Sequence, residues 1–311
     1  MYAYNLILYH MPNRLGISDF LTIRNIMVGR APDIEVHILS DSAAVPANFW
    51  QMAAARPTLI FSPSYLVRID AAARGTRLIS IAVRKLEEIE IIAGTGAAVP
   101  EARLITPELR LDEREWGPFT VIKPNRGLRG RGVRVMRTRD VRWTDTSILP
   151  MDDPRHGLEL LAQRYVDTGP FPTCYRVFTV LGRPIYCMSS TALEKSPELD
   201  VNDMDTLDFA VAANSMRRKL ELVNDSEVVE LASSVHAKFP HLPVMGIDII
   251  REKKTGRLFV LEYNSGGGVW HLSSSHGLKH QHEFRLDYYG QFDALGTIAD
   301  ALIKATRKLA A

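Results

Sequence analysis

The chain has 311 residues, which is long for one hydrophobic core, so we expect two or three packed lobes with a cleft between them. Hydrophobic residues make up 46% and charged residues 24%, and no apolar run approaches the roughly 20 residues that cross a bilayer, which argues against a membrane protein. The net charge is only +2, from 38 basic and 36 acidic side chains, and this balance argues against a nucleic-acid-binding protein.

The first residues, MYAYNLILYHMPNRLG, lack a basic leader before their short apolar run, so we expect no signal peptide and a cytoplasmic protein. The two cysteines, Cys174 and Cys187, lie in strand-like segments without the paired spacing of a zinc site, and we interpret both as core thiols. The oligomeric state stays open, and a homodimer is the commonest arrangement among homo-oligomers in general.

The first eighty residues alternate between strand-like and helix-like segments. Strand patterns in NLILYH, IEVHILS and TLIFSP are separated by helical patterns in DFLTIRNIMVGR and ANFWQMAAAR. This alternation predicts an open parallel α/β sheet. RKLEEIEIIAG then has the apolar spacing of a helix that ends at its glycines, and AVPEARLIT follows as a strand.

From residue 118 onward the pattern changes to short strands joined by tight turns, PFTVIKP, VRVMRT and LAQRYV, which predicts mixed or antiparallel pairing. Two hairpins are predicted next, CYRVFTV-LGRP-IYCMSS and VMGIDII-REKKTGR-LFVLEYN. Between them lies the helix DSEVVELASSVHAKF, with Asp225 or Ser226 as its N-cap, and the amphipathic helix FDALGTIADALIKATRKLA closes the chain. Residues from about 192 to 220 show no clear period and predict an irregular region.

A glycine-rich loop follows a strand that ends in a lysine, in the segment VIKPNRGLRGRGVRV. Its glycines would let backbone N–H groups approach an anion, while Lys123 and the loop arginines, Arg126 among them, add positive charge. The segment is not a Walker loop, because no Lys-Ser or Lys-Thr follows the glycines and the next element is a strand. Taken alone, the pattern also fits an ordinary hairpin turn.

Two acidic strands form the second candidate site. Asp248 lies in MGIDII, and Glu262 and Asn264 lie in VLEYNS, two residues apart and therefore on one face of a strand. Three oxygen ligands of this kind suit Mg²⁺, which takes its remaining ligands from water and phosphate. The alternative is that these polar groups decorate the solvent face of a hairpin.

Several motifs, in the same order, resemble the ATP-grasp superfamily over residues 84 to 268. They are the entry segment RKLEEIEIIAGTGAAVPEARLIT, the lysine strand and loop TVIKPNRGLRGRGV, the hinge LAQRYVDTG, the strand pair CYRVFTVLGRPIYC, and the strand ends GIDII and LEYN. One departure concerns CMSSTAL, since many members carry a second arginine there. This departure leaves the chemistry of the acceptor side open.

The resemblance implies a role for each matching residue. It implies ATP binding by Lys85, Lys123, Arg126, Gly127, Gly130, Gly132, Gln163, Tyr165 and Val166, with the backbone of Tyr165 and Val166 at the adenine. It implies Mg²⁺, with Mn²⁺ as an alternative ion, on Asp248, Glu262 and Asn264. Lys123 and Arg176 become the expected catalytic residues, with Arg176 at the transferred phosphate.

The fold class expected from the resemblance is α/β (α+β), with an N-terminal open α/β lobe and two α+β subdomains that clasp ATP. We place the lobe at residues 1–83, the small subdomain at 84–164 and the metal and acceptor subdomain at 165–311. The implied activity is ligation of a small carboxylate, activated as an acyl-phosphate, to an amine. The alternatives are a noncatalytic or regulatory ATP-binding module and a phosphotransferase.

Histidines crowd the segment HLSSSHGLKHQH, at His271, His276, His280 and His282. Their spacing is compatible with metal ligation, but the segment shows no nearby carboxylate set and no clear helix. We therefore expect the segment, including Ser273, to border the acceptor pocket, and Trp270 to serve in packing.

Overall fold

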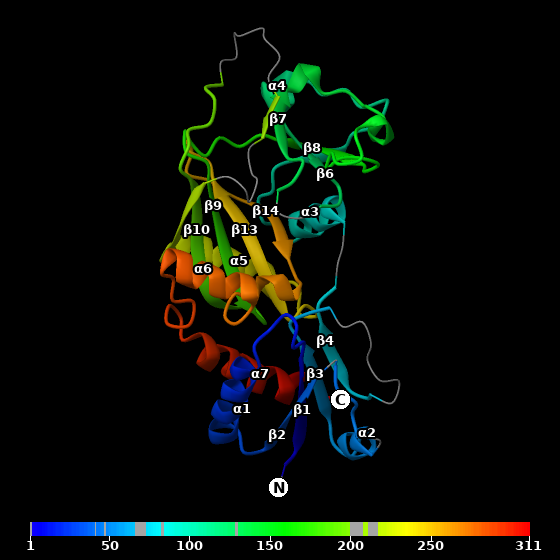
Figure 1. Ribbon diagram of the computed structural model, residues 1–311, viewed down its shortest axis with the longest axis vertical. Helices are drawn as coiled ribbons and strands as arrows, with labels where there is room; N and C mark the ends of the chain where they lie inside the picture. The colour runs from blue at the N-terminus through cyan, green and yellow to red at the C-terminus, as the bar shows by residue number, and fades with distance from the viewer. Residues whose placement is uncertain are drawn as a thin grey trace.

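The computed structural model describes residues 2–40, 42–46, 48–65, 73–81, 84–127, 130–199, 208–210 and 217–311. Figure 1 shows an elongated molecule with an N-terminal lobe at one end, a large antiparallel sheet in the middle and a small antiparallel sheet at the other end. None of the helices in these ranges has the length and apolar character that a membrane crossing requires.

The N-terminal lobe is a four-stranded sheet with strand order β2-β1-β3-β4, and all its strand pairs are parallel. Its elements are β1 (Tyr4–His10), α1 (Ile17–Arg30), β2 (Ile34–Ser40), α2 (Phe49–Ala53), β3 (Thr58–Ser62) and β4 (Thr76–Ile79). The parallel α/β sheet predicted from the alternating pattern is therefore confirmed. Helix α2 is shorter than predicted: the helical pattern covers residues 47–56, and the helix spans Phe49–Ala53.

The small sheet has the order β11-β7-β6-β8-β5 and is antiparallel, as the tight turns predicted. It comprises β5 (Ala102–Leu104), β6 (Phe119–Pro124), β7 (Arg134–Arg137), β8 (Leu160–Arg164) and β11 (Asp208–Ala210), with α3 (Lys85–Gly94) before it and α4 (Glu113–Trp116) beside β6. Helix α3 also contacts the large sheet, so it lies at the junction of the two sheets (Figure 1).

The large sheet has the order β12-β10-β9-β13-β14 and is antiparallel. It comprises β9 (Thr173–Val180), β10 (Arg183–Ala192), β12 (Arg218–Leu222), β13 (Val244–Arg251) and β14 (Leu258–Asn264). Helix α5 (Ser226–Ala237) lies between β12 and β13 in the chain, and α6 (Ser275–Phe284) and α7 (Ala294–Leu309) follow β14. Both predicted hairpins are confirmed. The Asp225 side chain accepts a hydrogen bond from the Val228 N–H at 3.2 Å, which confirms the predicted cap of α5.

The prediction of an irregular segment from 192 to 220 is wrong in two places. Strand β11 lies at 208–210, and β12 begins at Arg218 and pairs with β10. Its alternation was hidden because the segment RKLEL has charged residues at three of its five positions. Residues 200–207 and 211–216 of that segment lie outside the described ranges.

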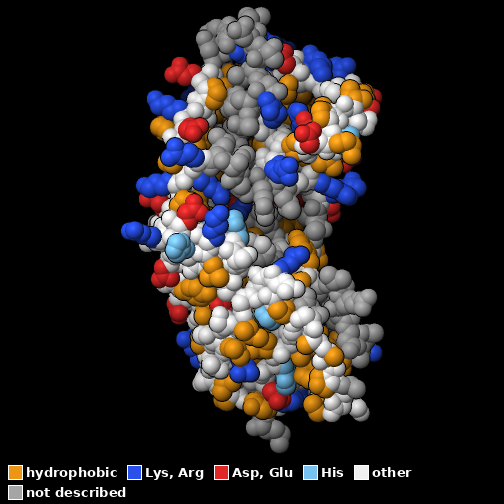
Figure 2. Space-filling view, in the orientation of Figure 1, with side chains coloured by type: hydrophobic (Ala, Val, Ile, Leu, Met, Phe, Trp, Pro, Cys, Tyr) orange, Lys and Arg blue, Asp and Glu red, His pale blue; other side chains and the backbone are white. Residues whose placement is uncertain are grey.

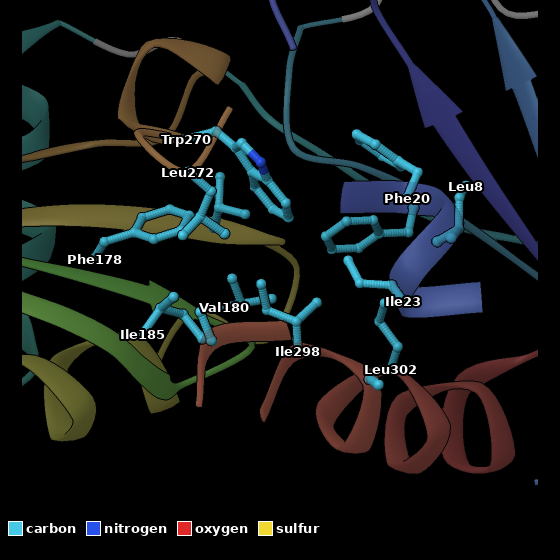
Figure 3. Close-up of a cluster of buried hydrophobic side chains, with 14 of the residues drawn as sticks. Leu8, Phe20, Ile23, Phe178, Val180, Ile185, Trp270, Leu272, Ile298 and Leu302 are labelled. Atoms are coloured by element: carbon cyan, nitrogen blue, oxygen red, sulfur yellow. The ribbon is translucent and has the colours of Figure 1, made fainter. Parts of the chain in front are cut away.

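One continuous core joins the N-terminal lobe to the large sheet. Phe20 and Ile23 from α1 meet Phe178 from β9, Trp270 and Ile298 from α7 in a single buried cluster (Figure 3). The C-terminal helix α7 contacts both α1 and β10. Its apolar stripe, which predicted an amphipathic helix, is buried in these contacts. The lobe is thus fixed against the face of the large sheet that carries the candidate site.

Candidate active site

Three neighbouring strands of the large sheet place charged side chains in one row. Arg176 on β9 lies opposite Asp248 on β13, and Asp248 lies opposite Glu262 on β14. The Arg176 guanidinium donates two hydrogen bonds to the Asp248 carboxylate, at 2.7 and 2.6 Å, which is the strong two-point geometry of an arginine–carboxylate pair. A single face of the sheet therefore presents a cation and two carboxylates side by side.

Asn264 lies two residues beyond Glu262 and opposite Gly246, so its side chain is on the same face. A Cβ atom at Gly246 would lie 2.7 Å from Cγ1 of Val269, which explains the glycine at that position. The Asn264 Nδ2 atom is buried without a hydrogen-bond partner. Asp248, Glu262 and Asn264 are thus brought to one end of a strand pair, as the sequence predicted.

Lys85, the first residue of α3, reaches across from the small-sheet side and donates a hydrogen bond to Glu262 Oε2. One helical turn later, Glu88 accepts a hydrogen bond from the Tyr263 N–H. Both contacts hold the start of α3 against β14. Because residues three apart share a helix face, Lys85 and Glu88 enter the site together.

Asn125 fixes the same helix to the small sheet. Its side-chain oxygen accepts from the Leu86 N–H at 3.1 Å, and its backbone oxygen accepts from the Lys85 N–H at 3.2 Å. Its amide group donates to Glu159 Oε2 at 3.1 Å. Since Asn125 follows the end of β6 directly, it sets the position of Lys85 relative to Lys123.

Lys123 is buried on β6, with 6% of its surface exposed. Burial lowers its pKa to about 8, and the nearby Lys85 adds to this effect, whereas Glu262 and Glu88 oppose it. No ion pair found among the described residues includes Lys123. A buried ammonium group that lacks a carboxylate partner is a favourable position for a phosphate.

The carboxylates respond to the same surroundings. Burial, followed by the charge of Glu262, raises the pKa of Glu88 to about 8. Burial also acts to raise the pKa of Glu262, but Lys85, Lys123 and Arg176 together hold it below its ordinary value. Burial raises the pKa of Asp248 against the opposing effect of Arg176. These perturbed groups are concentrated at one place, which is typical of a functional site.

The glycine-rich loop connects β6 to β7 at the same end of the small sheet. Gly130 and Gly132 have φ values of +66° and +76°, which favour glycine. A Cβ atom at Gly132 would also lie 3.1 Å from side-chain carbons of Pro124 and Arg155. Arg126 and Gly127 are exposed. The two loop residues between Gly127 and Gly130 lie outside the described ranges.

The hinge residues lie on the neighbouring strand. Gln163 on β8 is opposite Val121 and therefore on the same face as Lys123, and its side chain is buried. Tyr165 and Val166 follow the end of β8 half-buried, with the Tyr165 ring edge-on to Phe119 at 6.3 Å between centroids. The residues expected at the phosphates and at the adenine thus line consecutive strands of the small sheet.

The histidine segment differs from the expectation of no clear helix. Residues Ser275–Phe284 form α6, which is capped by Ser274 through a hydrogen bond from the Gly277 N–H at 3.2 Å. Ser273 instead donates to the buried Asp19 of α1, to which Trp270 Nε1 also donates at 2.7 Å. Among the residues described, no group of three or more His, Cys, Asp or Glu side chains is arranged to hold a metal ion.

The expectation of packing for Trp270 is confirmed, because it is fully buried between Phe20 and Phe178. Sequence reasoning missed Asp19, Glu88 and Asn125. Glu88 carried a usable signal, because it lies one turn from Lys85 on a helix that was predicted. Asp19 and Asn125 act through long-range hydrogen bonds, which no local pattern reveals.

Comparisons with known proteins give structural matches alone. No family model matches the chain, and no curated protein matches it. A structure of the ATP-grasp ligase PsnB with a phosphomimetic variant of its minimal precursor, Mg and ADP is 16% identical over 98% of this chain and 100% of that one, with a TM-score of 0.52. PsnB with its precursor peptide PsnA2 and AMPPNP is 14% identical over 97% and 98%, with a TM-score of 0.51.

A third match, D-cycloserine synthetase DcsG, is 15% identical over 97% of this chain and 99% of that chain, with a TM-score of 0.49. The PsnB matches span almost the whole of both chains, so the likeness extends over the N-terminal lobe and both antiparallel sheets of this chain. Identities this low carry information about the fold. The chain has the ATP-grasp fold, with an N-terminal α/β lobe and two α+β parts, each built on an antiparallel sheet.

Proposed function

We propose that this chain is an ATP- and Mg²⁺-dependent ligase that activates a carboxylate as an acyl-phosphate and joins it to an amine. The observation that carries the proposal is the row of Arg176, Asp248 and Glu262 facing Lys85 and the buried Lys123. Five charged groups placed together at the junction of two sheets are costly for folding unless a ligand uses them.

The donor set fits a magnesium ion. Asp248 and Glu262 lie directly opposite each other, and Asn264 adds an amide on the same face whose Nδ2 is unsatisfied. Oxygen ligands of this kind suit Mg²⁺, and when bound the ion would neutralise charge on the phosphates. The PsnB complex with Mg and ADP supports both ligands for this fold.

The two ion pairs of the site suggest how its charged side chains would bind ATP and the metal ion. In the structure, Lys85 pairs with Glu262 and Arg176 pairs with Asp248. A divalent cation on the two carboxylates would leave Lys85 and Arg176 to bind phosphate oxygens, together with Lys123. The site thus exchanges its internal pairs for pairs with the ligand, at little cost in unpaired charge.

The remaining residues have matching roles in the proposal. Arg126, Gly127, Gly130 and Gly132 cover the phosphates, and the segment from Gln163 to Val166 meets the adenine. Arg176 stabilises the charge that develops when a substrate carboxylate attacks the γ-phosphate. Closure of the loop excludes water, which protects the acyl-phosphate until the amine captures it.

Two other functions use the same residues, namely a noncatalytic ATP-binding module and a phosphotransferase. The test is a phosphate-release screen with Mg-ATP over amino acids, dipeptides and small carboxylic acids, followed by mass spectrometry of the products. A ligase releases phosphate only when both a carboxylate and an amine are present. A phosphorylated product, formed with ADP and without release of phosphate, would identify a phosphotransferase, and tight ATP binding without turnover would identify a module.

A further inference from the structure

The N-terminus of α3 is capped by a residue from another element. Helices α4, α5 and α6 are each capped by the side chain of the residue that precedes them. Arg84 precedes α3 and makes no such hydrogen bond. Asn125 instead accepts from the first two N–H groups of α3, through its backbone oxygen and its side-chain oxygen. Since these N–H groups have no partner within the helix, Asn125 acts as an N-cap from 39 residues farther along the chain.

Asn125 is itself held in one position. It is buried, with 4% of its surface exposed, and its N–H donates to the Glu159 backbone oxygen at 2.8 Å. Its side-chain amide donates to Glu159 Oε2 at 3.1 Å. All four polar atoms of Asn125 therefore have a hydrogen-bond partner, two on α3 and two on Glu159. A buried side chain whose hydrogen bonds are all made is rigid, so it can fix the helix that it caps.

Lys85 is the charged residue that this cap holds in place. It is the first residue of α3, and its side chain reaches Glu262 of the large sheet. Asn125 lies two residues after Lys123 of the small sheet, so the cap links the two lysines proposed to bind phosphate. Figure 2 shows Lys and Arg side chains spread over the half of the molecule that holds both antiparallel sheets. Attraction for a phosphate there does not depend on one cation, and the cap contributes the position of Lys85 rather than charge.

We propose that Asn125 is a positioning residue for ATP binding, which acts through Lys85 by capping α3 from the small sheet. The inference rests on the proposed function, in which Lys85 and Lys123 bind the phosphates together. Once Glu262 binds a metal ion, Lys85 no longer has that carboxylate as its partner. The cap then keeps the backbone of Lys85 in register with Lys123, so that both cations meet the same phosphate chain without a further loss of freedom.

The test is a double-mutant cycle, read by calorimetric titration of Mg-ATP into the full chain. Asn125→Ala should weaken binding about ten-fold in the otherwise wild-type protein. In Lys85→Met the same substitution should cost less than about two-fold, because the cap then has no cation to position. An equal loss in both backgrounds, or no loss in either, would overturn the role through Lys85. The wild-type titration tests the proposed function separately, since Mg-ATP can bind the wild type while the cycle shows no coupling.

The partner of Asn125 gives a second test, which applies even if Lys85→Met binds ATP too weakly to measure. Glu159→Gln keeps an acceptor for the Asn125 amide and should bind Mg-ATP as the wild type does. Glu159→Ala removes that acceptor and should weaken binding about three-fold or more. The same affinity in both Glu159 variants would contradict the role of Asn125 as a fixed cap.

Asp225→Ala is the control for stability, because it removes the local cap of α5 together with an ion pair to Arg251. Asn125→Ala should lower the melting temperature by about 2–4 °C, as the loss of one cap implies, and Asp225→Ala should lower it at least as much. Only Asn125→Ala should weaken the binding of Mg-ATP in the same samples. A ten-fold weaker affinity in Asp225→Ala as well would assign the effect to stability and overturn the positioning role.

Discussion

The two faces of the large sheet differ in kind, although the same strands build both. Toward α5, the strands present Val177, Ile247 and Val260, which are fully buried and apolar. Toward the N-terminal lobe and α3, the neighbouring positions are Arg176 and Asp248. Strand alternation therefore places packing and chemistry one residue apart.

The difference shows what each face contributes. Apolar burial of the α5 face supplies stability, at about 1.5–3 kcal/mol for a fully buried side chain of this size. Partly buried ion pairs such as Arg176–Asp248, in which 30% of the arginine side chain and 10% of the aspartate side chain are exposed, supply little net stability, because their desolvation offsets their attraction. The charges on the site face are thus best explained by ligand binding, and substitutions on the two faces should separate stability from activity.

Replacing Ile247 on the apolar face should give the largest loss of stability. Ile247→Ala leaves a cavity beneath α5, and we expect the free energy of unfolding to fall by about 2–5 kcal/mol. Urea unfolding measures this change, and the affinity of the folded protein for Mg-ATP should stay as in the wild type. A variant that kept its stability but lost ATP binding would reverse the roles assigned to the two faces.

On the site face, Arg176→Ala should lower turnover by about 10²–10³, the usual effect of losing one preorganised donor to a developing charge. Turnover is measured as phosphate release with the carboxylate and amine that stimulate the wild type. Arg251→Ala is the matched control, because it breaks the ion pair of another strand arginine with Asp225 at 2.8 Å, away from the site row. Similar losses in both variants would remove the catalytic role of Arg176.

Asn264→Ala should separate metal binding from stability. Because the Asn264 Nδ2 is buried and unsatisfied, its removal should change the free energy of unfolding by no more than about 1 kcal/mol. Loss of the side-chain oxygen should weaken Mg²⁺-dependent ATP binding by about ten-fold or more. Thermal unfolding and calorimetry on the same sample measure the two effects. Strong destabilisation with normal Mg²⁺ dependence would contradict the ligand role.

Affinity for Mg-ATP should fall as the pH rises through about 8. In the free protein the pKa of Lys123 is lowered to about 8, so its positive charge is lost above that pH, and Glu88, with a raised pKa of about 8, gains negative charge in the same range. Each transition weakens phosphate binding by at most about ten-fold per pH unit. Calorimetry between pH 7.5 and 9.5 should show a weaker slope for Lys123→Met and for Glu88→Gln. A pH-independent wild-type affinity would contradict these assignments.

The smallest effect expected concerns the glycine loop. Gly132→Ala and the control Gly256→Ala place a side chain at nearly the same φ, +76° and +73°, and each should cost about 1–2 kcal/mol of stability. Only Gly132 belongs to the loop, so only its substitution should also weaken ATP binding. Gly256 has no atom within 4 Å of a built Cβ, which makes it a suitable control for backbone strain alone. Equal ATP affinities in the two variants would argue against a phosphate role for the loop.

The sequence predicted the elements that rest on local periodicity. Alternation in MGIDII and LFVLEYN was sufficient to place Asp248, Glu262 and Asn264 on one face, because that inference needs only strand geometry and hairpin pairing. The parallel lobe followed in the same way from strand and helix alternation.

Other features depend on contacts between distant segments. Asp19 binds Trp270, 251 residues away, and Asn125 binds the N-terminus of α3 from the adjacent sheet. Strand β12 joins the large sheet only through its pairing with β10, and the charged residues of that strand concealed it. Tertiary pairing, rather than local pattern, decided these positions.

The most direct test of the site is calorimetric titration of ATP into the wild-type chain and into Glu262→Gln, with and without Mg²⁺. Glu262 faces both Asp248 and Lys85, so it connects the proposed metal ligands to the lysines proposed to bind phosphate. We expect ATP to bind the wild type tightly only when Mg²⁺ is present, and this dependence to be lost in Glu262→Gln. Absent binding in the wild type, or the same Mg²⁺ dependence in both proteins, would contradict the proposed site.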